Sequence, residues 1–283
     1  MNIFNNDNHA DNTWTDKKSG THWLRDLLPS RCPNARILTY QYNANVAFGA
    51  SSAGIEEQAK NMLRCIWLER KSNSVRPIIF IAHSMGGIIV KEALALAFHD
   101  DKAYPMIWVF TFGIVFFGVP HRGSEYGSWE GVVANIVRTS LNRPGSSFLS
   151  SVESGSAYNE QLNARFQPLL SAFMFLSVCE TLPEETPQGI SLGTIVHKDS
   201  AILGLSDREE IKIYPNCTHR TICKFASATE PEWKQVSDII CYAAMRTVNS
   251  FDYSPTIHRR KKMFENLSWH LEGTCTPMFC ILR

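Results

Sequence analysis

Ala82-His83-Ser84-Met85-Gly86-Gly87 is the motif from which the architecture of this chain can be inferred. It follows a short β-branched run at 78–81 and precedes a helix-forming stretch at 88–98. A serine on a tight turn between a strand and a helix needs small residues two places before and after it, and the alanine and the first glycine fill those places. The pattern therefore predicts a nucleophile elbow, with Ser84 as the nucleophile. The Met85 N–H, at the start of the helix, would point to where an oxyanion forms.

A serine hydroxyl is a poor nucleophile at neutral pH, so Ser84 needs a base within hydrogen-bond reach and an acid that orients the base. Where such an elbow is used, the acid and then the histidine follow the serine along the chain. His219 is the favoured base, because it lies in a turn between a short predicted strand at 211–214 and an amphipathic stretch at 232–245. His83 and His121 are assigned structural roles: His83 points to the other face of the elbow, and His121 fixes the turn that follows the next strand.

Two acids compete for the third position. Glu180 follows the predicted strand at 173–178, where the orienting acid is expected. Asp199 follows another predicted strand at 194–196, and it could equally begin a turn or cap the residues at 200–203. We favour Glu180 and keep Asp199 as the alternative.

The order of elements predicts an α/β fold. A strand at 35–40 and a helix at 55–70 form one βα unit, the strand and helix around Ser84 form a second, and 109–117 is a third strand. Strands that alternate with helices indicate a mostly parallel sheet covered on both faces. With 283 residues, of which 44% are hydrophobic, the chain can bury one large core.

Composition excludes several classes of function. The formal net charge is +1, and the lysines and arginines are scattered except for a short cluster at 258–262, so nucleic-acid binding is not expected. The longest apolar run, 106–119, is too short to span a membrane and is interpreted as a buried central strand.

The cysteines and the first twelve residues indicate in which cellular compartment the protein is expected and whether it is expected to bind a cofactor. The eight cysteines fall mostly inside predicted strands and helices, as reduced core thiols of an intracellular protein do, and the segment 1–12 has neither a secretory nor an import pattern. Cys217, His219 and Cys223 are close in sequence, but no paired Cys-x-x-Cys partner exists elsewhere, so neither a metal nor another cofactor is expected.

Six stretches together carry a resemblance. They are Thr13-Trp14-Thr15, Trp23-Leu24-Arg25-Asp26-Leu27-Leu28-Pro29, Ala35-Arg36-Ile37-Leu38-Thr39-Tyr40, the elbow itself, Phe117-Gly118-Val119-Pro120-His121-Arg122-Gly123-Ser124 and His219-Arg220-Thr221-Ile222-Cys223-Lys224-Phe225. With them, about 13–246 resembles the SERAC-type serine esterase/lipase family, which is related to the DUF676 lipase-like domains. In filamentous fungi such domains stand alone or precede NACHT or NB-ARC receptor domains.

The resemblance implies an α/β-hydrolase fold, a Ser/acid/His triad and carboxylic or phospholipid ester substrates. It also implies a cytoplasmic location or an association with mitochondria or the endoplasmic reticulum, peripheral membrane association, and a NACHT or NB-ARC type partner. The family normally opens with a strand and a His-Gly-Leu-Gly-Gly-like turn that supplies the second oxyanion donor. Here an Asn- and Asp-rich segment stands at 1–12, so that opening strand is expected to be missing.

We therefore divide the chain into a divergent segment at 1–12, an α/β-hydrolase domain at 13–248 and a tail or linker at 249–283. The leading hypothesis is a serine esterase/lipase that uses Ser84, His219 and Glu180. The alternative is a catalytically impaired domain that serves as a signalling or interaction module. Because the loss of one oxyanion donor typically lowers the rate ~10²- to 10³-fold, an incomplete oxyanion hole would favour the alternative.

Overall fold

A computed structural model describes most of the chain. The described residues are 9–42, 52–71, 76–100, 104–125, 127–141, 155–185, 189, 191–245, 260, 262 and 278–282. Within them, a six-stranded sheet has the order β1-β6-β2-β3-β4-β5, and neighbouring strands pair in parallel. The strands are β1 (Arg36–Tyr40), β2 (Ile78–His83), β3 (Thr111–Phe117), β4 (Met174–Val178), β5 (Glu210–Ile213) and β6 (Met278–Leu282).

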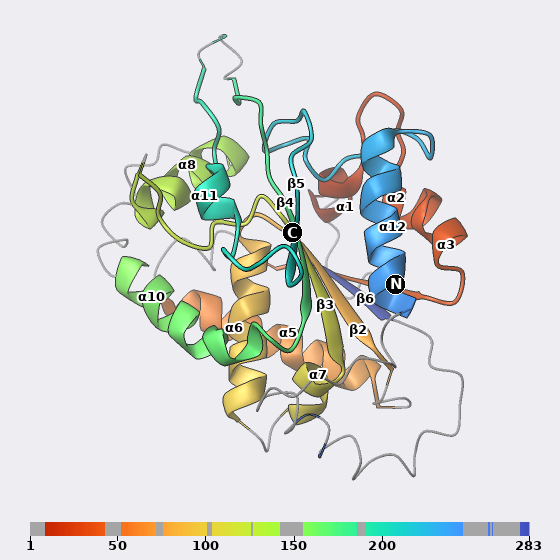
Figure 1. The fold of residues 1–283 in the computed structure, drawn as a ribbon, viewed down its shortest axis with the longest axis vertical. Helices are drawn as coiled ribbons and strands as arrows, with labels where there is room; N and C mark the ends of the chain where they lie inside the picture. The colour runs from red at the N-terminus through yellow and green to blue at the C-terminus, as the bar shows by residue number, and fades with distance from the viewer. Residues whose placement is uncertain are drawn as a thin grey trace.

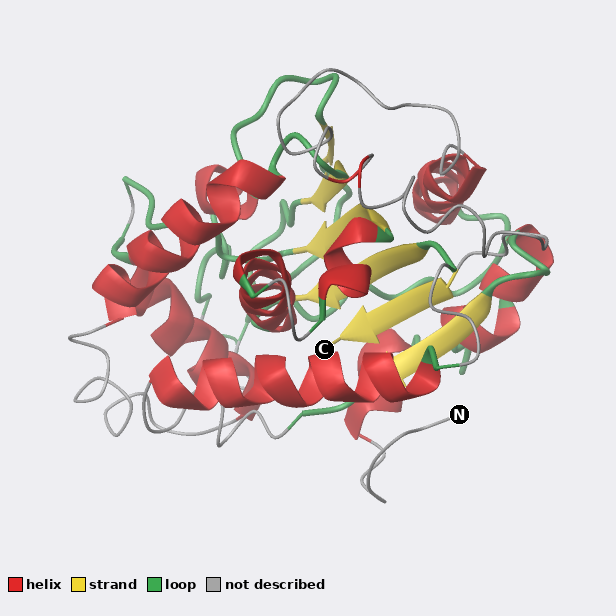
Figure 2. Cartoon of the chain, turned by 90° about the horizontal axis from the view of Figure 1, so that it is seen from below, coloured by secondary structure: helices red, strands yellow, loops and turns green. Residues whose placement is uncertain are grey.

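Helices cover both faces of this sheet (Figures 1 and 2). One face carries α5 (Ser52–Glu69), α6 (Gly86–His99), α7 (Pro105–Val109), α8 (Trp129–Leu141) and α10 (Gly155–Phe166). The other face carries α1 (His9–Trp14), α2 (Trp23–Asp26), α3 (Leu28–Arg31) and α12 (Pro231–Met245). Two short helices, η1 (Gln167–Leu169) and α11 (Lys198–Ala201), lie in the connections.

The hydrophobic core consists of two clusters of side chains, one on each face of the sheet. In β2, Phe80 packs with the α5 and α6 side, whereas Ile79 and Ile81 pack with the α12 side. Successive residues of a strand point to opposite faces, and both faces here are covered, so β2 is buried along its whole length. This observation confirms the predicted α/β fold with a parallel sheet.

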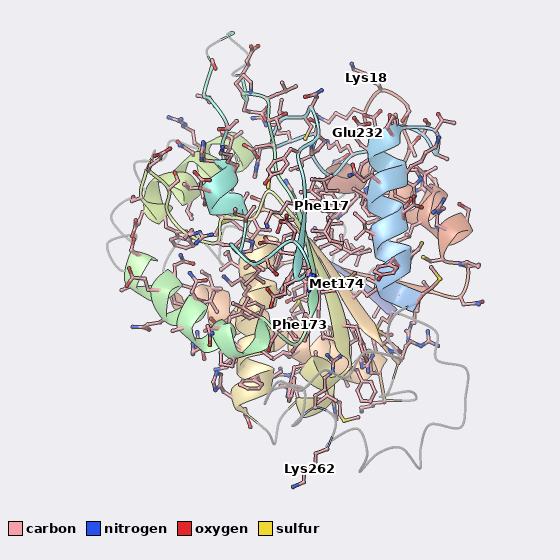
Figure 3. The ribbon with its side chains drawn as sticks, in the orientation of Figure 1. Lys18, Phe117, Phe173, Met174, Glu232 and Lys262 are labelled. Atoms are coloured by element: carbon pink, nitrogen blue, oxygen red, sulfur yellow. The ribbon has the colours of Figure 1, made fainter. Side chains whose placement is uncertain are left out.

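Side chains drawn on the ribbon show the same layering (Figure 3). Phe117 lies inside the molecule at the end of β3, whereas Lys18 and Lys262 extend toward opposite ends of the molecule. Within the described residues, no helix combines the length and the hydrophobicity that a membrane span requires.

Most predicted elements lie within a few residues of the observed ones, but two predictions were wrong. Residues 194–196 form no strand, because the chain there turns into α11. The apolar run at 106–119 is not one strand: it begins inside α7, which has Pro105 in its first turn, and only then enters β3.

The largest difference concerns the segment 249–283, which was predicted to be a tail or linker. Met278–Leu282 forms β6, a fully buried strand that pairs in parallel with β1 on one side and β2 on the other. The sheet position between those strands is therefore occupied by residues far along the chain. Five consecutive apolar residues can be buried on both faces of a sheet, but nothing local to them specifies which neighbours they pair with. The domain boundaries stay a prediction.

Candidate active site

Ser84 lies on a strained turn between β2 and α6. Its φ is +54°, a value that a non-glycine residue rarely adopts. The Ser84 N–H donates to the Phe117 carbonyl at 2.8 Å, and the Gly87 N–H donates back to the Ser84 carbonyl at 3.0 Å. A Cβ at Gly87 would lie 2.4 Å from the Val119 side chain, so the start of α6 can lie this close to Val119 only with glycine at this position. These contacts produce the elbow that the sequence predicts.

A histidine and a carboxylate complete a hydrogen-bonded chain with this serine. His219 Nε2 is 2.9 Å from Ser84 Oγ, and His219 Nδ1 is 2.6 Å from Glu180 Oε2. The His219 and Glu180 side chains are both fully buried. The second oxygen of Glu180 accepts from the Val196 N–H at 2.9 Å, which fixes the carboxylate from the opposite side. An imidazole held between a hydroxyl and a carboxylate can accept the hydroxyl proton while the carboxylate stabilises the imidazolium.

Parallel topology explains why residues so far apart in sequence meet. Ser84 follows β2, Glu180 comes two residues after the end of β4, and His219 lies in the loop between β5 and α12. The carboxyl ends of parallel strands share one edge of the sheet, so the loops that follow them converge there.

The loop that carries His219 is anchored from the α12 face. Trp23 Nε1 donates to the Cys223 carbonyl at 2.9 Å, and the Trp23 ring packs against Phe225 and Trp233 with centroid distances of 5.5 and 5.3 Å. These large buried rings limit the positions that the loop can take, and thereby fix the backbone of His219.

His83 has a closer relation to the site than the sequence suggested. Its Nε2–H donates to the His219 carbonyl at 3.0 Å, and the two rings lie 5.0 Å apart. Burial, and to a smaller extent the neighbouring His219, lowers the pKa of His83 to about 3, so its imidazole is neutral. His83 therefore positions the backbone of His219. In the sequence, its position next to Ser84 was the feature that could have marked it as a residue of the site.

Gly118 was also missed as a site residue. Its φ is +53°, and a Cβ there would lie 3.1 Å from His219 Nδ1 and 3.4 Å from Glu180 Oε2. The glycine thus leaves room for the hydrogen bond between the imidazole and the carboxylate.

The alternative acid lies elsewhere. Asp199 Oδ2 is 3.3 Å from Nδ1 of His197, in a pair whose side chains are 49% and 25% exposed, respectively. The Asp199 N–H also donates to His197 at the start of α11. The structure brings Glu180, and not Asp199, to His219.

His121 lies in the turn that follows β3, and Met85 lies at the start of α6. The His121 N–H donates to the Ser200 carbonyl, and its own carbonyl accepts from Asn159 and Asn163, which fixes the turn after β3. Met85 is the N-cap residue of α6, and its N–H donates to none of the described residues. In the described part of the chain, no group of three or more His, Cys, Asp or Glu residues is arranged to hold a metal ion.

Comparisons with known proteins give a consistent set of relatives. No protein-family model matches the chain. Protein SERAC1 of Danio rerio is 30% identical over 209 residues, which are 71% of this chain and 30% of the zebrafish protein. Protein SERAC1 of Homo sapiens is 28% identical over 210 residues, or 72% of this chain and 30% of the human protein. The chain thus spans about three tenths of the length of the curated relatives it matches.

The fungal context and the DUF676 relationship stay predictions. Over most of its length, this chain is similar to the SERAC1 proteins.

Proposed function

We propose that this chain is a serine hydrolase that cleaves carboxylic esters, including those of phospholipids. One observation carries the proposal: Ser84 on a strained elbow shares a continuous buried hydrogen-bond chain with His219 and Glu180. The similarity to SERAC1 proteins supports lipid esters as the substrate class, through the resemblance to SERAC-type esterases.

In the proposed reaction, Ser84 Oγ attacks the ester carbonyl carbon while His219 Nε2 accepts the hydroxyl proton. The carbonyl oxygen becomes an oxyanion, to which the Met85 N–H donates, aided by the positive end of the α6 dipole. His219 then gives its proton to the departing alcohol, which leaves an acyl-serine. Water, activated by the same imidazole, hydrolyses this acyl group and restores Ser84.

Glu180 has two tasks in this scheme. Its Oε2 accepts the Nδ1–H of His219, which keeps Nε2 unprotonated and directed at the serine. It also compensates the positive charge of the imidazolium in a site that excludes water. Because Val196 N–H holds the other oxygen, the carboxylate can perform both tasks without moving.

A fluorophosphonate probe tests the proposal, because it phosphonylates only activated serines. We expect labelling of the wild-type chain at Ser84, and no labelling of Ser84→Ala or His219→Ala. Circular dichroism and thermal unfolding establish that each variant is folded. A folded wild-type chain without labelling would reject the hydrolase proposal in favour of a binding or signalling module.

A further inference from the structure

Two thiols meet on the face of the sheet opposite α6. Cys32 caps the C-terminal end of α3, and Cys241 lies in α12, 209 residues further along the chain. Their Sγ atoms are 2.8 Å apart, and both cysteines are free thiols with little exposed surface. The two sulfur atoms are therefore already in contact in the folded chain.

The surroundings make the two thiols chemically unequal. The Cys241 thiol donates to the Arg31 carbonyl at 3.6 Å, and its sulfur lies beside the Cys32 thiol and near the Arg31 guanidinium. The hydrogen bond from Cys32, assisted by the charge of Arg31, holds the pKa of Cys241 below its usual range. The pKa of Cys32 is raised, chiefly by its hydrogen bond with Cys241. A thiolate is the nucleophilic form of cysteine, so Cys241 is the thiol that reacts first.

We propose that Cys32 and Cys241 are a redox modification site at which hydrogen peroxide converts a dithiol into a disulfide that joins α3 to α12. The Cys241 thiolate attacks one peroxide oxygen, the O–O bond breaks, and Cys241 sulfenic acid and hydroxide form. The Cys32 sulfur then attacks the Cys241 sulfur, its proton and the leaving hydroxide form water, and the S–S bond closes. The proton that Cys241 released to become a thiolate neutralises the first hydroxide, so that two thiols are oxidised and one peroxide is reduced to two waters.

The position of the pair gives the bond a structural consequence. α12 carries Trp233, which packs against Trp23 of α2, and Trp23 in turn holds the Cys223 carbonyl in the His219 loop. A covalent link between α3 and α12 closes a very long loop in the unfolded chain, which favours the folded state. It also ties α12 to α3, the helix that directly follows α2 in the chain. The inference does not depend on the proposed hydrolase activity.

The experiment titrates the full chain with hydrogen peroxide and measures intact mass, peptide maps and thermal unfolding. We expect loss of two hydrogens, a peptide linking Cys32 to Cys241, and a Tm higher by on the order of 5–10 °C that dithiothreitol reverses. Cys65→Ser is the matched control, because Cys65 is a half-buried thiol of α5 on the opposite face; this variant keeps the full response.

Two further variants separate the two roles. Cys32→Ser leaves Cys241 without a resolving thiol, so Cys241 should accumulate added oxygen instead of a disulfide. Cys241→Ser should leave Cys32 largely unoxidised at the same peroxide dose. The proposal is overturned if Cys32 and Cys241 stay alkylatable in the wild type while the other thiols are oxidised, or if the linked peptide contains another cysteine.

Discussion

Glu180 contacts His219 and Asp199 contacts His197, but the two carboxylate–imidazole pairs differ in burial and in what lies beyond the imidazole. The first pair is fully buried with a separation of 2.6 Å, whereas the second is 3.3 Å apart and substantially exposed. His219 reaches on to a serine hydroxyl, whereas His197 begins a short helix. The same two kinds of functional group therefore form a candidate proton relay in one place and a helix cap in the other.

Environment is the physical reason for this difference. An ion pair or charged hydrogen bond in a site without water interacts far more strongly than one at the surface, where solvent and salt screen it. A buried carboxylate also has to be satisfied, and Glu180 is held by both His219 and the Val196 N–H. Only the buried pair is both oriented and strong enough to fix a histidine tautomer.

The largest expected effect comes from removing the imidazoles. His219→Ala should lower ester turnover at least ~10⁴-fold, because the proton acceptor is lost, whereas His197→Ala should retain wild-type turnover to within ~3-fold. Steady-state hydrolysis of a p-nitrophenyl ester measures both. The double variant Ser84→Ala/His219→Ala should be scarcely worse than either single variant, because the two side chains act as a unit. Equal losses in His219→Ala and His197→Ala would refute the distinction between the pairs.

The acids should differ in the same sense. Glu180→Gln preserves the shape of the side chain but removes the charge that holds the imidazole tautomer, so we expect a loss of turnover on the order of 10³- to 10⁴-fold. Asp199→Asn should change turnover by less than ~3-fold, because it alters an exposed contact. Rates are compared at equal folded fraction, determined by circular dichroism. The opposite ranking would transfer the orienting role to Asp199.

A Cβ added at each of two glycines with positive φ would disturb the surroundings of one carboxylate–imidazole pair or the other by steric contact. Gly118→Ala would place a Cβ against His219 and Glu180, and Gly204→Ala would place one 2.7 Å from Nη2 of Arg122, whose Nε donates to the Asp199 carbonyl. Both changes should cost about 1–2 kcal/mol of stability, because alanine resists a left-handed backbone. Only Gly118→Ala should also lower turnover, by ~10²-fold, because it displaces the imidazole. Urea denaturation and ester assays separate the two effects, and a similar loss of turnover in both variants would contradict the assignment.

The last expected effect concerns the pH dependence of stability. The unfolded chain protonates His83 as pH falls through about 6.5, whereas the folded chain keeps it neutral down to about 3. Stability contributed by neutral His83 is therefore present above pH 6.5 and is lost as pH falls toward 3, by at most ~1.4 kcal/mol per pH unit. In His83→Gln, whose amide can still donate to the His219 carbonyl, the free energy of unfolding should fall less steeply between pH 6 and 4. Equal slopes for variant and wild type, measured by urea denaturation, would show that His83 is not held neutral.

Local sequence predicted the elbow well because its requirements are local. A strand, a tight turn with small flanking residues, and a helix all lie within about twenty positions of Ser84. Glu180 was favoured over Asp199 for a related reason, since it follows a clear strand. The strand expected at 194–196 was wrong, because three residues carry too little periodicity to distinguish a strand from a turn.

Local patterns in the sequence were enough to predict that strands alternate with helices, that Ser84 sits on an elbow, and that a histidine and an acid should follow it. Tertiary structure alone decided that β6 enters the sheet between β1 and β2, and that His83 and Gly118 border the imidazole of His219. It also decided which carboxylate the imidazole contacts. This division follows from how far along the chain each interaction reaches. Turn geometry and hydrophobic period depend on neighbours in sequence, whereas pairing, burial and hydrogen bonds between distant loops depend on how the whole sheet is assembled.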